Sequence, residues 1–192
     1  MKDVMIATGN SNKVREYREI LEPLGYVVHD LKEIEHLEVE ETGSTFAENA
    51  LIKAESLKGI YDMIVIADDS GLEIEALDNQ PGIHSARFLA GYDYDYKNRT
   101  ILKMLKDEKN RKARFVCAIA LVDEEKHVFE GVMSGSIAYE MKGDNGFGYD
   151  PIFMTEEYGL TSAQLSPEQK NAISHRGKAT RLLLEYLKGK NR

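Results

Sequence analysis

Apolar and polar positions alternate near the N-terminus in the order expected of an α/β protein. An apolar run at residues 4–7 is followed by the polar segment TGNSNK, and apolar residues then recur at helical spacing from Val14 to Leu24. This pattern predicts a strand, a turn and a helix. Gly25 can end that helix in a left-handed conformation, and the segment YVVHDL after it predicts a second strand.

Further helices follow from capping residues and from apolar residues at helical spacing. They are a helix in STFAENALIKAESLKG with Thr45 and Glu48 at capping-box spacing and Gly59 as its stop, a helix over residues 96–105 with Asp95 as its cap, a helix beginning at Ser166-Pro167, and a helix over residues 177–187. The alternation of these helices with apolar runs places the chain in the α/β class.

Long apolar runs between the helices predict the strands of one mixed sheet. Residues 63–67 form a continuous apolar run, typical of a strand covered on both faces, and the alternating segment GLEIEAL follows an expected turn at Ser70-Gly71. The runs 114–122 and 127–139 are separated by the polar DEEK, which indicates an antiparallel hairpin. No linker rich in Gly, Pro or Ser divides the chain, so residues 1–192 are expected to form one domain of two lobes that share the sheet.

The charge balance narrows the classes of partner. With a formal net charge of −8, the chain lacks the clustered basic residues that bind a phosphate backbone, so no nucleic acid is expected. The short basic cluster KNRKAR, residues 109–114, is interpreted as an exposed loop. No apolar run approaches the ~18 residues of a membrane span, and the N-terminus lacks the apolar region of a signal peptide. These features predict a cytoplasmic protein in which the single cysteine, Cys117, is buried.

The polar segment ATGNSNK, at the start of the first helix, could bind a triphosphate or another anion. Backbone N–H groups point out of a helix N-terminus, and a glycine allows close approach. Thr8, Gly9, Asn10 and Lys13 are the residues that suit this role. The segment is too short for a Walker loop, and a plain strand-to-helix turn capped by Ser11 or Asn12 is the alternative.

Two pairs of adjacent acids are candidates for metal binding. Glu40 and Glu41 precede the helix that carries Lys53, and they are either solvated charges near a helix N-terminus or ligands of a hard cation shared with substrate phosphates. Asp68 and Asp69 end a buried strand, where two carboxylates require a metal ion or a basic side chain unless they only cap a turn. Side chains alternate along an extended segment, so one aspartate is expected at the metal, with the other supporting it or activating water.

Two segments near the C-terminus could recognise a polar ligand. GDNGFGYDP combines three glycines with two aromatic residues, so Phe147 or Tyr149 could stack on a base while the glycine backbone reads its edge. A purely structural loop is the alternative. KNAISHRG groups Lys170, His175 and Arg176 as possible donors to such a ligand. None of the five histidines has the neighbours of a zinc site.

Six motifs in a fixed order resemble the inosine triphosphate pyrophosphatase family over about residues 5–187. They are TGNSNK, EETGSTFAENALIKA, ADDSGLEIEAL, PGIHSARF, GFGYDPIF and ISHRGKA. The resemblance implies an α/β fold with a long, twisted mixed sheet flanked by helices, and a nucleotide cleft between two lobes. It also implies a homodimer that uses Mg²⁺ to hydrolyse ITP, dITP and XTP to the monophosphate and pyrophosphate, which removes non-standard purine nucleotides from the pool.

The resemblance also assigns roles to individual residues. The triphosphate would be held by Thr8, Gly9, Asn10, Ser11, Asn12 and Lys13, with Lys53 assisting and Ser70 as a further substrate contact. The metal would be bound by Glu41 and Asp69, and the catalytic set would be Asp69 as proton acceptor, Asp68 as its support and Lys53. The base and sugar pocket would consist of Phe147, Gly148, Tyr149, Asp150, Lys170, His175 and Arg176.

Two alternatives to this function stay open. The chain could be a house-cleaning pyrophosphatase for modified pyrimidines or standard nucleotides, or a nucleotide-binding regulator without turnover. The candidate acids and Lys53 argue against a regulator, because binding alone requires no carboxylate that activates water.

Selection of hypoxanthine and xanthine must act at the six position, where both carry a carbonyl oxygen and adenine an amino group. Donors such as Arg176 or the backbone near Gly148 would pair with that oxygen.

Overall fold

Two compact units make up the part of the chain that the computed structural model describes, residues 2–32 and 39–190. Unit 1 comprises residues 1–69 and 118–129, and unit 2 comprises residues 70–117 and 130–192. Three long strands supply residues to both units, namely β3 (Ile64–Ile74), β5 (Lys112–Val122) and β6 (Lys126–Ile137). The division within β3 falls between Asp69 and Ser70, two of the predicted site residues. A single domain with a nucleotide cleft stays a prediction.

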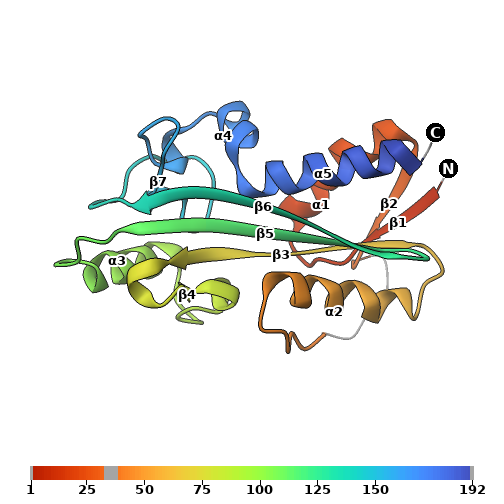
Figure 1. The fold of residues 1–192 in the computed structure, drawn as a ribbon, viewed down its shortest axis with the longest axis horizontal. Coiled ribbons are helices and arrows are strands. Elements are labelled where there is room, and N and C mark those ends of the chain that lie inside the picture. Colours follow the sequence, from red (N-terminus) through yellow and green to blue (C-terminus); the bar gives the residue numbers. More distant parts are fainter. Residues whose placement is uncertain (1, 33–38, 191–192) are drawn as a thin grey trace. The chain divides into compact units, whose positions relative to one another are not determined.

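The other elements alternate helices and strands, as the hydrophobic pattern predicts. In chain order they are β1 (Lys2–Ile6), α1 (Ser11–Leu21), η1 (Glu22–Leu24), β2 (Tyr26–Asp30), α2 (Phe46–Lys58), η2 (Glu75–Leu77), β4 (Gln80–Pro81), η3 (Gly82–His84), α3 (Tyr94–Met104), η4 (Asp150–Ile152), β7 (Phe153–Thr155), η5 (Ser162–Gln164), α4 (Pro167–Ile173) and α5 (His175–Lys190), where η marks a 3-10 helix. The strands are hydrogen-bonded in the order β2-β1-β3-β5-β6-β7, with β4 paired to β3 (Figure 1). Parallel and antiparallel pairs both occur, so the predicted α/β fold with a mixed sheet is confirmed.

Unit 1 is built on parallel strands. β1 pairs with β2 and with the first part of β3, and α2 lies beside that part of β3 (Figure 1). Because β1 and β3 are parallel, the loop after Ile6 lies beside the residues that follow Ile66, and the N–H of Ala7 donates to the Ile66 carbonyl at 2.7 Å. This register brings the polar segment after β1 next to the two aspartates of β3.

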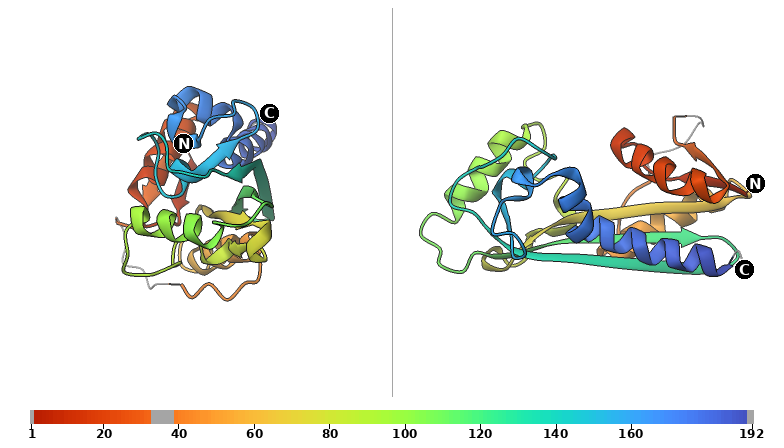
Figure 2. Two further views of the ribbon diagram at one scale, coloured as in Figure 1. Left: turned by 90° about the vertical axis from the view of Figure 1, so that its left-hand side faces the viewer. Right: turned by 90° about the horizontal axis from the view of Figure 1, so that it is seen from above.

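Unit 2 is built on antiparallel pairs around an apolar core. β4 is antiparallel to β3, and β7 is antiparallel to β6. α5 begins so close to β6 that a Cβ at Gly131 would overlap the carbonyl oxygen of His175, so only glycine fits at that position (Figure 2). The core receives side chains from β3, α3, β5, β6 and β7, among them Leu72, Ile101, Phe115, Met133 and Phe153.

Most predicted elements are confirmed, and the differences have local causes. β3 does not turn at Ser70-Gly71 but continues to Ile74, so both aspartates lie inside an extended strand. α3 begins earlier than predicted, because Asp93 rather than Asp95 accepts a hydrogen bond from the N–H of Tyr96, at 2.9 Å. The short strands β4 and β7 carry too few residues for an alternating pattern to predict them.

Helix capping agrees with the sequence in part. Thr45 accepts a hydrogen bond from the N–H of Glu48 at 3.1 Å and so caps α2, but the Glu48 carboxylate accepts from the N–H of Ser44, at 2.6 Å, instead of that of Thr45. α4 carries a complete capping box between Ser166 and Gln169. The sequence therefore predicts both helix starts correctly but misplaces one hydrogen bond.

The interpretation of residues 109–114 as an exposed loop holds for Lys109 but is wrong from Arg111 onward. β5 begins at Lys112, and Arg111 is buried, with its guanidinium donating to three backbone carbonyls at 2.6–2.7 Å. A guanidinium has five N–H donors, so it can bind the carbonyl at the end of α3 and two carbonyls at the end of β6 at the same time. Cys117, further along β5, is buried as predicted.

Candidate active site

The predicted anion-binding segment forms the start of α1. Asn10 caps this helix in place of the two predicted caps, since its Oδ1 accepts a hydrogen bond from the N–H of Lys13 at 3.4 Å. Thr8 Oγ1 in turn accepts from the N–H of Asn10 at 3.2 Å. No described atom lies within 4 Å of the position that a Cβ would take on Gly9, so that side of the loop is open.

The positive end of the α1 helix dipole is not neutralised by an acidic side chain in the first turn of the helix. This turn carries Lys13 and no acidic residue, so nothing within the turn neutralises the dipole. Ser11 Oγ accepts a hydrogen bond from Lys32 Nζ at 2.8 Å, which places a second ammonium group nearby. The side chain of Asn12 lies outside the described part of the structure. These features suit an anion better than a plain turn would.

Asp68 is buried in unit 1 and paired with a lysine. The residue is 1% exposed, and its Oδ2 lies 2.6 Å from Lys13 Nζ. A buried carboxylate requires such a partner, because removing a lone charge from water is costly. The pair ties the first turn of α1 to β3. The basic side chain that the sequence analysis requires beside a buried carboxylate is therefore present for Asp68.

Asp69 contacts a different lysine. Lys53 Nζ, from α2, lies 2.9 Å from Glu41 Oε1 and 3.5 Å from Asp69 Oδ1, and it donates to the backbone carbonyl of Asp68 at 2.8 Å. Adjacent residues of a strand point to opposite sides, which is why the two aspartates have separate partners. Glu40, in contrast, is exposed. We call Lys13, Glu41, Lys53, Asp68 and Asp69 the carboxylate–lysine cluster.

Burial and charge shift the ionisation of this cluster. Burial raises the pKa of the Asp69 carboxyl above its ordinary value, and the neighbouring carboxylates act in the same direction, against the lowering effect of Lys53 and Lys13. Burial alone would lower the pKa of the Lys53 ammonium, but the three carboxylates around it outweigh burial and raise that pKa. Lys53 therefore stays charged, whereas Asp69 is a stronger base than an exposed aspartate.

The donor set of the cluster fits a hard cation. Asp69 Oδ2 is buried and has no hydrogen-bond partner among the described residues, and Glu41 lies beside the same lysine as Asp69. Mg²⁺ takes one or two carboxylates from a protein and completes its shell with water and substrate phosphates. Within residues 2–32 and 39–190, no group of three or more acidic, histidine or cysteine side chains is arranged to hold a metal. A pair of carboxylates is the set available.

In unit 2, an ion pair holds the predicted base-reading loop, residues 143–151, which we call the glycine loop. Asp150 is buried, and its Oδ2 accepts a hydrogen bond from the N–H of Phe147 at 2.8 Å and lies 2.5 Å from Lys170 Nζ. The pair joins α4 to the loop. Gly146 and Gly148 have φ values of 77° and 66°, a region that other residues rarely adopt. The Asp150 contacts and the two glycines with positive φ thus fix the conformation of the loop.

The two aromatic residues of the glycine loop have different environments. Tyr149 is 4% exposed, and its hydroxyl donates to the Ser85 carbonyl at 2.7 Å. Phe147 is 49% exposed, and the cationic ends of Lys170 and Arg176 lie 5.1 and 5.9 Å from its ring centroid. Of the two rings that the sequence offers for stacking, Phe147 is therefore the one with an accessible surface.

The remaining predicted residues of unit 2 lie at the start of α5 and in β3. Arg176 Nη2 donates to Ser70 Oγ at 3.2 Å, so the residue after Asp69 contacts the His-Arg motif. The ring of His175 is buried and stacks on Phe115, with centroids 4.8 Å apart and an interplanar angle of 12°. This gives His175 a packing contact in the core of unit 2.

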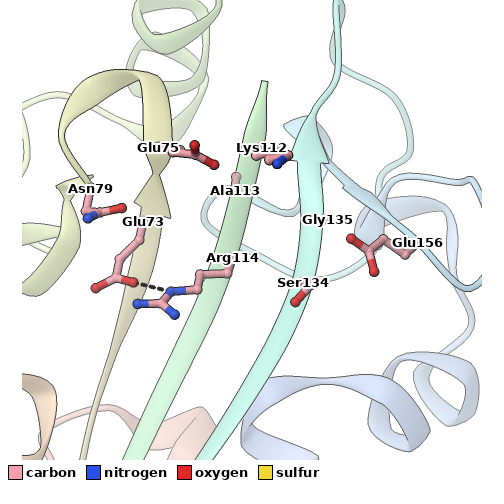
Figure 3. A pocket seen from close by; sticks show the side chains of 9 residues that line it. All are labelled: Glu73, Glu75, Asn79, Lys112, Ala113, Arg114, Ser134, Gly135 and Glu156. Atoms are coloured by element: carbon pink, nitrogen blue, oxygen red, sulfur yellow. Dashed lines mark hydrogen bonds and ion pairs between the residues drawn. The ribbon is translucent and has the colours of Figure 1, made fainter. Parts of the chain in front are cut away.

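A polar cavity of about 520 Å³ lies elsewhere in unit 2, and no predicted site residue lines it (Figure 3). Arg114 Nε and Glu73 Oε2 lie 2.5 Å apart there, so the guanidinium group of the cavity already has a carboxylate partner. Its other charged residues are Glu75, Lys112 and Glu156. Three acids against two bases do not favour an anionic substrate, so this cavity is set apart from the candidate site.

Two buried asparagines support the site, and sequence reasoning missed both. Asn49 of α2 accepts a hydrogen bond from the N–H of Gly43 at 2.8 Å, close in the chain to Glu41. Asn98 of α3 donates to the carbonyl of Gly148 at 3.0 Å. Both side chains are essentially inaccessible to solvent. In the sequence, each is recognisable only as a polar residue on the apolar face of a helix, and this position does not indicate which group it binds.

Comparisons with known proteins agree with this geometry. A model of the Ham1 family matches residues 4–186, and the chain belongs to that family. The chain is 47% identical to a dITP/XTP pyrophosphatase of Bacillus anthracis over 195 residues, which cover 97% of this chain and 96% of the relative. The family prediction made from the six motifs is thereby confirmed.

Solved structures of the family share the fold. The Ham1 protein of Staphylococcus aureus superposes with a TM-score of 0.92 at 43% identity, covering 98% of this chain and all of the other. A Ham1 protein of Coxiella burnetii gives a TM-score of 0.93 at 40% identity, with the same coverage. The similarity therefore extends over nearly all of this chain and the whole of each relative.

Proposed function

We propose that this chain is a nucleoside triphosphate pyrophosphatase, which hydrolyses ITP, dITP and XTP to the nucleoside monophosphate and pyrophosphate and so removes non-standard purine nucleotides from the nucleotide pool. Membership of the Ham1 family and 47% identity to a dITP/XTP pyrophosphatase support this function. The observation that carries it is the carboxylate–lysine cluster, in which two lysines and three carboxylates meet beside the start of α1. Phosphoryl transfer is stabilised by cations near the phosphate oxygens and by a carboxylate that orients or deprotonates the nucleophile, and this cluster offers both.

Phosphate binding is assigned to the start of α1 and to the two lysines of the cluster. The N–H groups of the first turn and the uncompensated dipole attract negative charge, and the open side of Gly9 lets a phosphate approach the backbone. Lys13 and Lys53 are held by carboxylates before any substrate arrives. Positioned charges of this kind do not have to be ordered during the reaction.

Glu41 and Asp69 are proposed to hold Mg²⁺ together with the substrate phosphates. When bound there, the cation would supply neutralisation of the phosphate oxygens and stabilisation of the pyrophosphate leaving group. The donor set supports this assignment, because the carboxylates of Glu41 and Asp69 border the same charged lysine.

The two adjacent aspartates are proposed to divide the work. Asp69 Oδ2 would accept the proton of the attacking water, because this oxygen has no hydrogen-bond partner among the described residues. Asp68 would hold Lys13 in place through their ion pair, and its backbone carbonyl would hold Lys53. Asp68 then acts through the lysines, whereas Asp69 touches the reacting atoms.

Recognition of the base is assigned to unit 2. The exposed ring of Phe147 offers a surface on which any purine can stack. Arg176 and the backbone of the glycine loop would pair with the six-position oxygen of hypoxanthine or xanthine, and an adenine amino group would leave these donors unpaired. Lys170, Asp150 and Tyr149 would keep the loop in shape, and Ser70 and His175 would complete the pocket.

The remaining proposals concern assembly and location. A homodimer in the cytoplasm, without nucleic-acid partners, is proposed from the family resemblance and from the net charge of −8. Within the described residues, each helix is too short or too polar to span a bilayer. Sedimentation of the purified chain would measure the oligomeric state.

A single assay tests the proposed function. The purified protein is incubated with Mg²⁺ and separately with ITP, XTP, dUTP, ATP and GTP, and pyrophosphate and orthophosphate are both measured. We expect pyrophosphate from ITP and XTP, with much slower release from ATP, whose six-position amino group cannot pair with the same donors. Orthophosphate as the sole inorganic product, or equal rates with ATP and ITP, would contradict the proposal. A preference for dUTP would favour the pyrimidine alternative, and binding without turnover would favour a regulator.

A further inference from the structure

Helix α3 supports the glycine loop through two side chains. Asn98 is 1% exposed, and its Nδ2 donates to the carbonyl oxygen of Gly148 at 3.0 Å. Tyr94, one turn earlier in α3, faces Gly148 and meets the ring of Tyr149 edge-on, with ring centroids 5.3 Å apart. Neither Asn98 nor Tyr94 is among the residues that the family resemblance assigns to the site.

The conformation of Gly148 makes the direction of its carbonyl depend on this hydrogen bond. Its φ of 66° lies in a region that is open to glycine and strained for other residues. The three atoms nearest to a Cβ at this position would be carbons of Tyr94, at ordinary distances of 3.6–4.0 Å, so space alone does not require glycine. A residue with so much backbone freedom keeps one carbonyl direction only where a partner holds it, and Asn98 is such a partner.

The other amide atom of Asn98 argues against a purely structural role. Asn98 Oδ1 is buried and has no hydrogen-bond partner among the described residues. An unpaired buried acceptor destabilises the folded state, and a leucine, which has the same branching, would avoid that penalty. Packing of α3 against the loop would therefore favour an apolar residue. Leucine could not donate a hydrogen bond to the Gly148 carbonyl, however, and this bond is what the asparagine provides.

We propose that Asn98 is a positioning residue for purine discrimination. By holding the Gly148 carbonyl toward α3, it sets the orientation of the peptide groups that follow Phe147 and that read the edge of the base. Tyr94 restricts the same loop by packing. This inference rests on the proposed function and deepens it, because it assigns base selectivity to a helix that touches the loop and not to the loop alone.

The test compares two changes at Asn98 with a control on the same helix. Asn98→Leu removes the donor and the unpaired acceptor, and Asn98→Asp keeps the shape but turns a carboxylate oxygen toward the Gly148 carbonyl. The control is Arg99→Ala, which loses only an exposed pair with Asp95. For each protein, kcat and KM are measured with ITP and with ATP, and thermal unfolding is recorded.

We expect the ratio of kcat/KM for ITP to that for ATP to fall by about tenfold in both Asn98 variants, the equivalent of one well-formed hydrogen bond. The fall should come from a higher KM for ITP, with kcat retained, and Arg99→Ala should keep the wild-type ratio. An unchanged ratio in a folded Asn98→Leu protein, or a loss of stability without a change in the ratio, would overturn the inference. A wild-type enzyme without preference for ITP would instead contradict the proposed function.

A second variant covers the case in which the Asn98 variants do not fold. Tyr94 is partly exposed, so Tyr94→Ala removes the packing on Gly148 and on Tyr149 with little cost to the core. We expect this variant to lower the same ratio by about threefold, in line with one aromatic pair. A folded Tyr94→Ala protein with the wild-type ratio would count against the support of the loop by α3.

Discussion

The carboxylate–lysine cluster of unit 1 and the glycine loop of unit 2 use different physical means. The cluster consists of full charges from α1, α2, β3 and the segment before α2, and each of its ion pairs joins side chains that are distant in the sequence. The loop consists of glycines, one exposed ring and backbone groups, held by a buried ion pair and by single hydrogen bonds. Charge acts on phosphates, which all nucleotides share, whereas shape and backbone groups can distinguish bases.

This comparison separates two kinds of defect. A change in the cluster should slow turnover of every nucleotide, because the reacting phosphorus is the same in each. A change in the loop should alter affinity or the preference among bases and leave the chemical step intact.

The largest effect is expected for Asp69→Asn. The amide cannot accept the proton of the attacking water and binds a cation poorly, so kcat should fall by roughly 10²–10⁴-fold for ITP and ATP alike. Nucleotide binding should remain measurable by titration. The control is Glu40→Gln, which changes an exposed acid close in the chain to Glu41 and should keep near-normal activity. Near-normal turnover in Asp69→Asn would show that the base lies elsewhere.

A smaller effect, on stability, is expected for Asp68→Asn. The change leaves Lys13 Nζ without its buried partner, and breaking such a pair lowers the free energy of unfolding by about 3 kcal/mol. Urea denaturation measures this value. Asp62→Asn, which affects an exposed pair with Lys58, should change it by less than about 0.5 kcal/mol. Equal stability of the two variants would mean that the Lys13 pair contributes nothing to the fold.

For the loop, Phe147→Ala should raise KM by about tenfold for ITP and ATP, with kcat unchanged. Loss of one base–aromatic stack accounts for this size, and stacking does not distinguish the bases. Steady-state kinetics with both nucleotides measure it. An unchanged KM would leave the exposed ring without a role in binding.

The smallest effect is expected for Tyr149→Phe. The hydroxyl of Tyr149 donates to the Ser85 carbonyl inside unit 2, so its removal should lower the free energy of unfolding by about 1 kcal/mol. KM and kcat should stay within twofold of wild type, roughly the scatter of neutral changes. If KM for ITP rose as much as in Phe147→Ala, the two rings would have to share the binding of the base.

The sequence predicts local features of this molecule better than long-range ones. The caps Thr45 and Ser166, the left-handed Gly25 and the alternation at Asp68 and Asp69 depend on neighbours within a few residues, and the structure has them as predicted. The family motifs then supplied the candidate residues. Their roles were not deducible from local patterns, because the partners of these side chains are set by the fold.

Long-range contacts account for what the sequence did not predict. The sequence around Arg111 predicts a solvated basic loop, but its partners Ile137 and Ala138 lie at and just after the end of β6. Asn98 lies 50 residues from Gly148, and neither position alone indicates the other. The cap of α3 was misplaced for a simpler reason, since Asp93 and Asp95 are chemically equivalent and only the backbone conformation selects between them.

Two lysines provide the most direct test of the separation between chemistry and selection. Lys53 in the cluster and Lys170 beside the glycine loop are each 19% exposed, and each pairs with a carboxylate. In Lys53→Ala, kcat/KM should fall by about 10²-fold for ITP and for ATP, so that their ratio is kept. In Lys170→Ala the ratio itself should fall toward one, because Asp150 and the loop lose their partner. A changed ratio in Lys53→Ala, or a kept ratio in Lys170→Ala, would contradict the account.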